Sequence, residues 1–281
     1  MVEPISQDIM GTLTAGAGGD GELRLHEFES TVFHNARKLR VWVPPGYGSA
    51  ENAGRLYPVL YLNDGQNLFD PATAYAGVDW RVGQTGAELV RQGRVPPLVI
   101  VGIDHAGGDR IREFIPYPSM HPLVLKPHGR RYPEFLIREA MPFIQREYRV
   151  AQGPKFTGLG GSSLGAAIAL YTVTARPGVF GKLLLESPSL FVAGRQLLKH
   201  SRLVRVWPER VFLAIGSQES GHRERDEKLV GDAQSLANTL RRAGLKENRL
   251  KVWVEEGAGH NEGVWAHRFP EALEFLFRDG I

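Results

Sequence analysis

The residue types needed for nucleophilic attack on an ester carbonyl occur together in the second half of this sequence. Ser163 lies between Gly161 and Gly165 in a G-x-S-x-G pattern, which is typical of an exposed serine nucleophile. A serine hydroxyl is too weakly acidic to attack near neutral pH without a base, so a histidine and a carboxylate must accompany it. The chemistry that this pattern predicts is acyl transfer through a covalent serine intermediate.

The segments on both sides of Ser163 predict a strand followed at once by a helix. The apolar run over 155–159 has the composition of a buried strand, and apolar residues spaced by three and four over 164–175 predict a helix. Glycines beside the serine permit a tight turn, and the start of the helix directs N–H groups at an oxyanion. The pattern also occurs by chance in glycine-rich turns, but this context favours Ser163 as the nucleophile over such a turn and over its neighbour Ser162.

His260 has the setting expected of the general base. It follows the predicted strand over 250–254 in a glycine-containing loop and precedes the final predicted helix. Where a serine nucleophile lies on a strand-to-helix turn, the usual chain order is nucleophile, acid, histidine, and His260 fits the last place in it. His267 is the alternative, although its position one turn into a helix suits this role less well. Other histidines are interpreted as solvated surface residues, namely His26, His34, His200 and His222.

The carboxylate that completes such a set should follow the predicted strand over 211–215, because there it can orient the imidazole and stabilise its charged form. Glu219 lies four residues past this strand, and Asp226 lies further along the same segment. Glu224 and Glu227 alternate with basic residues in HRERDEK, which is typical of a solvated face. Residue position favours Glu219 and leaves Asp226 as the alternative.

Short apolar runs alternate with helical patterns along most of the chain. This alternation implies crossover connections, and hence an α/β fold with a mostly parallel central sheet and helices on both faces. We expect a flexible lead-in over 1–22 and a single domain over 23–281, with no separate cap domain. Strands are predicted over 23–28, 39–43, 57–63, 98–103, 155–159, 182–185, 211–215 and 250–254, and helices over 132–148, 164–175, 232–243 and 264–278.

A long segment over 105–131, rich in Pro, Gly and His, separates the fourth predicted strand from the first predicted helix. Long loops of this kind usually form lids or the walls of binding sites. Within it, Arg112 and Glu113 are interpreted as a structural ion pair rather than as substrate contacts. Further candidates for pocket walls or packing are Asp104, Tyr117, the segment 188–190, Phe69, Trp80 and Trp265.

The composition is that of an ordinary globular protein and excludes several functions. Of 281 residues, 42% are hydrophobic and 23% are charged, and the formal charge of +3 is spread without a basic block, so nothing points to nucleic acid. Cysteine is absent, which excludes disulfides, thiol nucleophiles and thiolate metal sites. Neither a signal peptide nor a run of ~20 apolar residues is visible, so we expect a cytoplasmic protein outside the membrane, unless a leader has been lost.

Five longer motifs follow one another along the chain: YPVLYLNDGQNLFD from Tyr57, GGSSLGA around Ser163, ESPSL from Glu186, IGSQES from Ile215 and GAGHNEGVWAHRFPEALEFL from Gly257. Together they resemble the esterase D and enterochelin esterase-like branch of the α/β-hydrolases, which is related to feruloyl and S-formylglutathione esterases and to mycolyltransferases. The resemblance covers nearly the whole chain from about Leu23 onward.

The resemblance implies an α/β-hydrolase fold and adds two assignments to the site. GSQE resembles the segment from which related esterases supply their acid, which favours Glu219 over Asp226. An oxyanion hole needs two N–H donors. The amide of Leu164 directly follows the nucleophile, and the resemblance implies the amide of Gln66 as the second donor. Gly65 would permit the turn that directs this amide inward.

The sequence thus predicts a serine hydrolase that cleaves small-molecule carboxylic esters through an acyl-enzyme, with no metal or cofactor. Metal-ligand spacings such as H-E-x-x-H are absent. Two alternatives stay open: an acyltransferase, which admits an alcohol in place of water, and a catalytically inactive hydrolase fold that serves as a binding module. The acyl and alcohol groups, and whether the chain is a monomer or a homo-oligomer, are not determined by the sequence.

Overall fold

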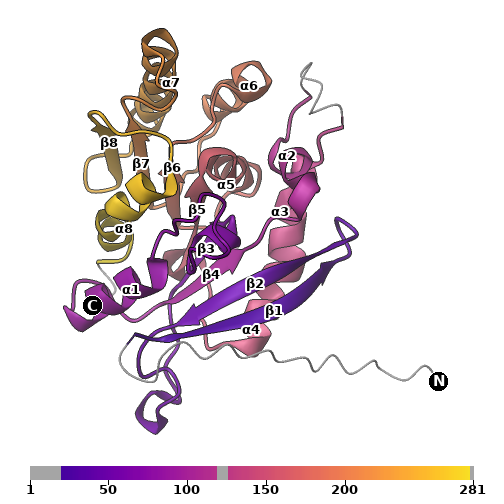
Figure 1. Ribbon diagram of the computed structural model, residues 1–281, viewed down its shortest axis with the longest axis vertical. Helices are drawn as coiled ribbons and strands as arrows, with labels where there is room; N and C mark the ends of the chain where they lie inside the picture. Colours follow the sequence, from indigo (N-terminus) through magenta and orange to yellow (C-terminus); the bar gives the residue numbers. More distant parts are fainter. Residues whose placement is uncertain (1–19, 119–125, 279–281) are drawn as a thin grey trace.

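The computed structural model describes residues 20–118 and 126–278 and arranges them around one mixed β-sheet (Figure 1). The strands are β1 (Glu22–Ser30), β2 (Asn35–Val43), β3 (Val59–Asn63), β4 (Val99–Ile103), β5 (Thr157–Ser162), β6 (Lys182–Glu186), β7 (Arg210–Gly216) and β8 (Leu250–Glu255). Their order across the sheet is β1-β2-β4-β3-β5-β6-β7-β8. The pairs β1–β2 and β2–β4 are antiparallel and all other neighbours are parallel, so the predicted mostly parallel sheet is confirmed.

Helices lie on both faces of this sheet, as predicted. They are α1 (Val82–Arg91), α2 (Arg110–Phe114), α3 (Tyr132–Phe135), α4 (Met141–Glu147), α5 (Ser163–Ala175), α6 (Val192–Ser201), α7 (Arg223–Arg242) and α8 (Glu262–Phe277). Helices α1 and α8 pack on one face, whereas α3 to α7 pack on the other (Figure 1). Single 3-10 turns lie over Ala50–Asn52, Gly65–Asn67, Gly107–Asp109, Gly129–Arg131 and Pro154–Phe156, and a π turn lies over Leu136–Ala140.

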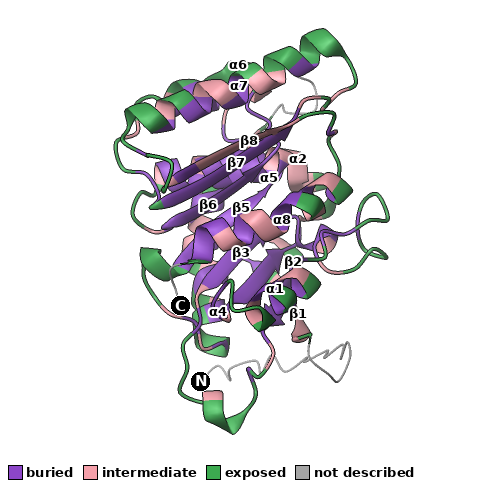
Figure 2. Ribbon diagram, turned by 90° about the vertical axis from the view of Figure 1, so that its left-hand side faces the viewer, coloured by how far each residue is buried: buried purple, intermediate pink, exposed green. Residues whose placement is uncertain are grey.

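Strand β3 shows why the sheet becomes the centre of the molecule. Leu60 and Leu62 pack on the side of α8, in the same core layer as Phe269, whereas Val59 and Tyr61 pack on the side of α5. Successive side chains of a strand point to opposite faces, so apolar residues at every position bury the sheet from both sides. Figure 2 shows the consequence: the central strands are buried throughout, and exposed residues gather on the outer sides of the helices and on the loops.

Pro142 explains why the helix predicted over 132–148 is not continuous. The structure divides this segment into α3, the π turn and α4. The amide of Met141 donates to the carbonyl of Leu136, five residues back. Proline has no N–H and collides with the carbonyl four residues earlier in a regular α-helix, so the wider π turn directly before Pro142 accommodates it.

The start of the helix predicted over 232–243 was wrong, because α7 begins nine residues earlier at Arg223. Glu224 and Asp226 lie in the first turn of α7, where acidic side chains interact favourably with the helix N-terminus. The alternating charges of HRERDEK therefore belong to the beginning of a helix, and all of these residues except Asp226 are exposed, as the sequence suggested.

The long loop after β4 contains α2, and the interpretation of Arg112 and Glu113 as an ion pair was wrong. Glu113 is buried and pairs with Arg37, with 2.9 Å between Oε2 and Nη1. Arg112 instead lies 3.6 Å from Asp109. Consecutive residues of a helix do not face each other, so the two side chains point to different partners. Residues 119–125 of the predicted lid or wall lie outside the described part of the chain.

The lead-in predicted over 1–22 falls mostly outside the described residues, which begin at residue 20, and β1 starts at Glu22. In the part of the chain that the structure describes, no helix combines the length and the apolar character that crossing a bilayer requires.

Candidate active site

Ser163 is the first residue of α5 and directly follows β5, on the strand-to-helix turn that its pattern predicts. Its φ of +54° is a left-handed conformation that residues other than glycine rarely adopt. The flanking glycines leave room for this turn. A Cβ at Gly161 would lie 3.0 Å from the carbonyl carbon of Gly165, and a Cβ at Gly165 would lie 2.9 Å from Asp64 Oδ2. The turn thus holds Ser163 in a strained and fixed position at the carboxyl edge of the sheet.

The turn is supported by a buried polar pair that sequence reasoning missed. Asn63, the last residue of β3, donates from Nδ2 to the carbonyl oxygen of Gly165 at 2.7 Å. The buried hydroxyl of Tyr132 in turn donates to Asn63 Oδ1. Burial raises the pKa of Tyr132, so its hydroxyl keeps the proton that it donates. No local pattern connects these residues, because they lie far apart in the sequence.

His260 and Glu219 contact each other beyond the carboxyl ends of β8 and β7, with Nδ1 of the imidazole against Oε2 of the carboxylate. The side chain of Glu219 is only 3% exposed. Its Oε1 accepts hydrogen bonds of 2.7 Å from the amide of Gly216 and from the hydroxyl of Ser187. The ring of Trp265 meets the imidazole edge to face, with centroids 5.0 Å apart. With Nδ1 held by the carboxylate, Nε2 is the nitrogen left to exchange a proton.

The loop after β6 connects Ser163 to this pair. Ser189 Oγ lies 3.2 Å from Ser163 Oγ, and the amide of Ser189 donates to the carbonyl of Ser163. Two residues earlier, Ser187 contacts Glu219. Among the hydrogen bonds of the described residues, none joins Ser163 to His260. Such bonds are commonly long without substrate and tighten when it binds. The structure therefore brings the predicted groups to one edge of the sheet, with the serine hydroxyl bonded to Ser189.

The alternative acid and the alternative base have other partners. Oδ1 of Asp226 accepts hydrogen bonds of 2.7 Å from the amide and the hydroxyl of Ser220, and these bonds lower the pKa of Asp226. His267 is exposed and lies 3.7 Å from Glu255. Within the described residues, neither Asp226 nor His267 forms a hydrogen bond with Ser163 or His260.

The turn after β3 differs in detail from the prediction. The left-handed residue is Asp64, with φ of +59°, rather than Gly65. Gly65 is needed because a Cβ there would lie 2.6 Å from the carbonyl carbon of Gly102 in β4. Arg110 of α2 holds Asp64 through two hydrogen bonds of 2.7 Å each. This bidentate pair fixes a turn that the sequence identified only by its glycine.

The amides predicted for the oxyanion hole belong to Gln66, in the 3-10 turn over Gly65–Asn67, and to Leu164, in the first turn of α5. The first N–H groups of a helix have no partner within it and are available to a bound oxyanion. Oε1 of Gln66 accepts from the amide of His105 at 3.4 Å, which connects this turn to the loop after β4.

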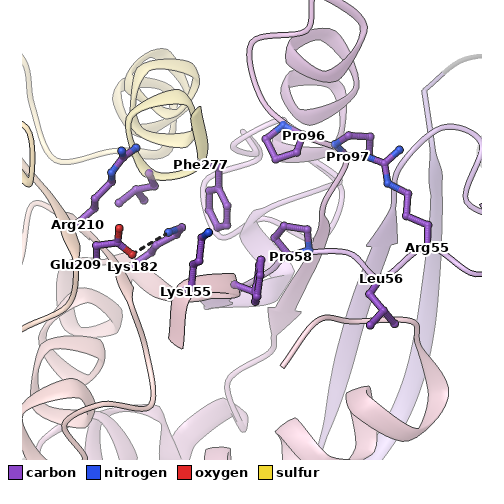
Figure 3. A pocket seen from close by; sticks show the side chains of 12 residues that line it. Arg55, Leu56, Pro58, Pro96, Pro97, Lys155, Lys182, Glu209, Arg210 and Phe277 are labelled. Atoms are coloured by element: carbon purple, nitrogen blue, oxygen red, sulfur yellow. Dashed lines mark ion pairs between the residues drawn. The ribbon is translucent and has the colours of Figure 1, made fainter. Parts of the chain in front are cut away.

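A separate cavity of about 160 Å³ lies at the opposite edge of the sheet (Figure 3). Its wall includes Pro58, Lys155, Lys182 and Phe277. Figure 3 shows both lysines beside the phenylalanine ring, with Lys182 Nζ 3.9 Å from a carboxylate oxygen of Glu209. These residues lie at or near the amino ends of parallel strands, whereas the candidate groups follow the carboxyl ends. The cavity is therefore not part of the candidate site.

The sheet order, the strained serine after β5 and the histidine after β8 define the class of protein as an α/β-hydrolase. A family model described as "Putative esterase" matches residues 30–276, and the chain belongs to this family. The protein is therefore a carboxylic ester hydrolase. Within the described residues, no group of three or more His, Cys, Asp or Glu side chains is arranged to hold a metal ion.

Several known proteins are similar to this chain. YbbA of Bacillus subtilis (strain 168) is 26% identical over 250 residues, which cover 86% of this chain and 92% of YbbA. The enterobactin esterase FES of Shigella flexneri has a TM-score of 0.70 at 19% identity, covering 94% of this chain and 61% of FES. An IroE-like serine hydrolase of Shewanella oneidensis has a TM-score of 0.71 at 20% identity, covering 92% and 81%. At these identities the two solved structures show a shared fold.

Proposed function

We propose that this protein hydrolyses carboxylic esters through an acyl-enzyme on Ser163, with His260 as the general base and Glu219 as the acid that orients it. The observation that carries the proposal is the convergence of three strand ends, with a strained serine after β5 and a buried carboxylate bound to an imidazole after β7 and β8. The amides of Gln66 and Leu164 form the oxyanion hole. The substrate is a small-molecule ester.

The proposed reaction begins when Ser163 Oγ leaves its contact with Ser189 and attacks the acyl carbonyl, while Nε2 of His260 takes the hydroxyl proton. The oxyanion hole stabilises the tetrahedral intermediate. Its collapse breaks the bond between the carbonyl carbon and the alcohol oxygen, and the alcohol leaves with the proton from His260. Water then attacks the acyl-enzyme while His260 takes its proton. The bond between the carbonyl carbon and Ser163 Oγ breaks, His260 returns the proton to Oγ, and the carboxylic acid is released.

A serine-directed fluorophosphonate probe tests the nucleophile. We expect the intact protein to be labelled, and Ser163→Ala to lose the label and about 10⁴-fold or more of kcat. Ser162→Ala is the matched control, because Ser162 is the adjacent, buried serine, and this variant should keep the label. Absence of labelling in the intact, folded protein would contradict the proposal and support the inactive binding module.

Paired substitutions test the acid. Glu219→Gln should lower kcat about 10²- to 10⁴-fold, because a neutral amide cannot stabilise the imidazolium that forms during attack. Asp226→Asn should change kcat by no more than about twofold, because this side chain bonds to Ser220 instead. The reverse ranking in steady-state assays would transfer the role to Asp226.

A substrate panel defines the ester that is cleaved. p-Nitrophenyl esters of increasing acyl length should be compared with feruloyl, S-formylglutathione and trilactone siderophore substrates, and we expect short acyl chains to react fastest.

An added alcohol distinguishes a hydrolase from an acyltransferase. Free acid as the main product supports the hydrolase, whereas a new ester of the added alcohol would identify an acyltransferase.

A further inference from the structure

Behind the proposed triad, the hydroxyl of Ser187 joins Glu219 to the last helix. Ser187 directly follows β6 and has a left-handed φ of +44°. Its Oγ lies 2.7 Å from Glu219 Oε1, 3.0 Å from Trp265 Nε1 and 3.4 Å from Arg268 Nη2. Trp265 and Arg268 are three residues apart on α8, so both reach the same hydroxyl from one face of the helix.

The chemistry of these partners determines which way the Ser187 hydroxyl points. Indole and guanidinium groups only donate, so the N–H groups of Trp265 and Arg268 occupy the two lone pairs of Oγ. The single hydroxyl proton is then left for Glu219, which as a carboxylate only accepts. The hydroxyl cannot rotate away without leaving the buried indole N–H of Trp265 unpaired, which costs free energy.

Arg268 gives this hydroxyl a positive neighbour that the fold holds in place. Its side chain is 0% exposed. It pairs with Glu186 at 2.8 Å and with Glu255 at 3.3 Å, at the ends of β6 and β8. A guanidinium buried between the carboxyl groups of Glu186 and Glu255 cannot move out into solvent without breaking both contacts. The hydroxyl of Ser187 is therefore oriented from α8, and Arg268 of this helix is itself held in place at the ends of β6 and β8.

We infer that Ser187 is a positioning residue for Glu219. Its hydroxyl, oriented by Trp265 and Arg268, holds the carboxylate in the rotamer that meets Nδ1 of His260 and stabilises the negative charge there. The inference rests on the proposed function, in which Glu219 is the triad acid. The hydroxyl of Ser187 bonds to Glu219, Trp265 and Arg268 and lies behind the carboxylate, so its loss should lower kcat and leave KM nearly unchanged.

A double-mutant cycle on the full chain, assayed with a p-nitrophenyl ester, tests this inference. Ser187→Ala should lower kcat about 10- to 100-fold, as expected for a lost hydrogen bond to a charged group. In the Glu219→Gln background, the same substitution should change kcat by less than about threefold, because the carboxylate that it positions is gone. An equal loss in both backgrounds would overturn the inference, since a general structural defect does not depend on Glu219.

Two further variants sharpen the test. Ser201→Ala is the matched control, because Ser201 is also a fully buried serine, and its hydroxyl bonds to the carbonyl of Leu197 in α6, away from the site. This variant should keep kcat within about twofold. Trp265→Phe keeps a ring beside His260 but removes the indole N–H, and should lower kcat by less than Ser187→Ala does.

The outcomes separate the inference from the proposed function. If Ser187→Ala behaves like Ser201→Ala while Glu219→Gln is strongly impaired, the positioning role is wrong and the triad stands. If Glu219→Gln keeps full activity, the proposed acid is wrong and the inference falls with it. Rates are divided by the concentration of sites that the fluorophosphonate labels, so that partly unfolded preparations do not imitate a loss of positioning.

Discussion

Three of the seven left-handed residues other than glycine in the described part of the chain lie at the proposed site. Asp64, Ser163 and Ser187 have φ of +59°, +54° and +44° and follow the ends of β3, β5 and β6. Such a conformation costs a non-glycine residue of order 1 kcal/mol or more, and it persists only where the surroundings impose it. Part of the backbone strain thus lies where side chains of the proposed site must be oriented, so stability and activity place opposing demands on these three positions.

This strain predicts a difference between two inactive variants of Ser163. Ser163→Gly should have a free energy of unfolding roughly 0.5 to 1 kcal/mol higher than Ser163→Ala, because only glycine adopts this φ without a steric cost. Chemical denaturation followed by tryptophan fluorescence measures the difference. Equal midpoints would show that the turn is not strained in solution.

Glu186 gives the stability of the protein a pH dependence. Burial raises its pKa from 4.5 to about 8, the nearby Glu219 and Glu255 add to this rise, and Arg268 opposes it. A carboxyl whose pKa is higher in the folded state favours folding while it is protonated. Its contribution is therefore complete below the unfolded pKa and is lost as the pH rises through the folded pKa.

The advantage in unfolding free energy of the natural protein over Glu186→Gln should accordingly shrink as the pH rises from 4.5 to about 8. Urea denaturation of both proteins at several pH values in this window measures the trend. Glutamine does not titrate. All other titrating groups are the same in the two proteins, so the difference between them isolates the contribution of Glu186. A constant difference across the window would contradict the raised pKa of Glu186.

At the scale of elements, two helical glycines have opposite surroundings. A Cβ at Gly86 in α1 would lie 3.0 Å from the ring of Trp42, whereas a Cβ at the exposed Gly231 in α7 would have nothing within 4 Å. Gly86→Leu should therefore lower the free energy of unfolding by about 1 to 3 kcal/mol through overpacking. Gly231→Ala should raise it by roughly 0.5 to 1 kcal/mol. Thermal or chemical denaturation measures both, and destabilisation by Gly231→Ala would refute the reading of an open helix face.

The glycines of α1 show which elements could not be predicted from the sequence. The strands were predictable because a sheet covered on both faces requires short, continuous apolar runs. Helix α1 was not predicted, since Gly83 and Gly86 argue against a helix locally, and only their contact with Trp42 explains them. Tertiary packing outweighed helix propensity there.

The residues of the proposed site likewise fall into those that the sequence predicts and those that it does not. Ser163, His260 and Glu219 carry local signals, because each follows a recognisable strand end. The residues that support them carry none. An arginine in a helix has the same local pattern whether it faces solvent or, like Arg268, a buried carboxylate. The role of Tyr132 likewise depends on Asn63, a residue on a distant strand.

At the scale of the whole molecule, both core layers pack against the same strands. We therefore propose that residues 23–281 unfold as one cooperative domain. Trp42, Trp80 and Trp265 report on one layer and Trp207 on the other. Urea transitions followed by tryptophan fluorescence, by far-UV circular dichroism and by loss of esterase activity should coincide. Separate transitions would indicate two units that unfold independently.

The amino ends of the parallel strands carry the lysine-lined cavity and none of the groups proposed to react. Lys155 is exposed at this edge. A protein coupled to a solid support through the amine of Lys155 would therefore face the surrounding solution with its opposite edge, so that esters reach Ser163 without passing the support. Attachment through a side chain of the loop after β4 would instead turn the edge that carries Ser163 toward the support.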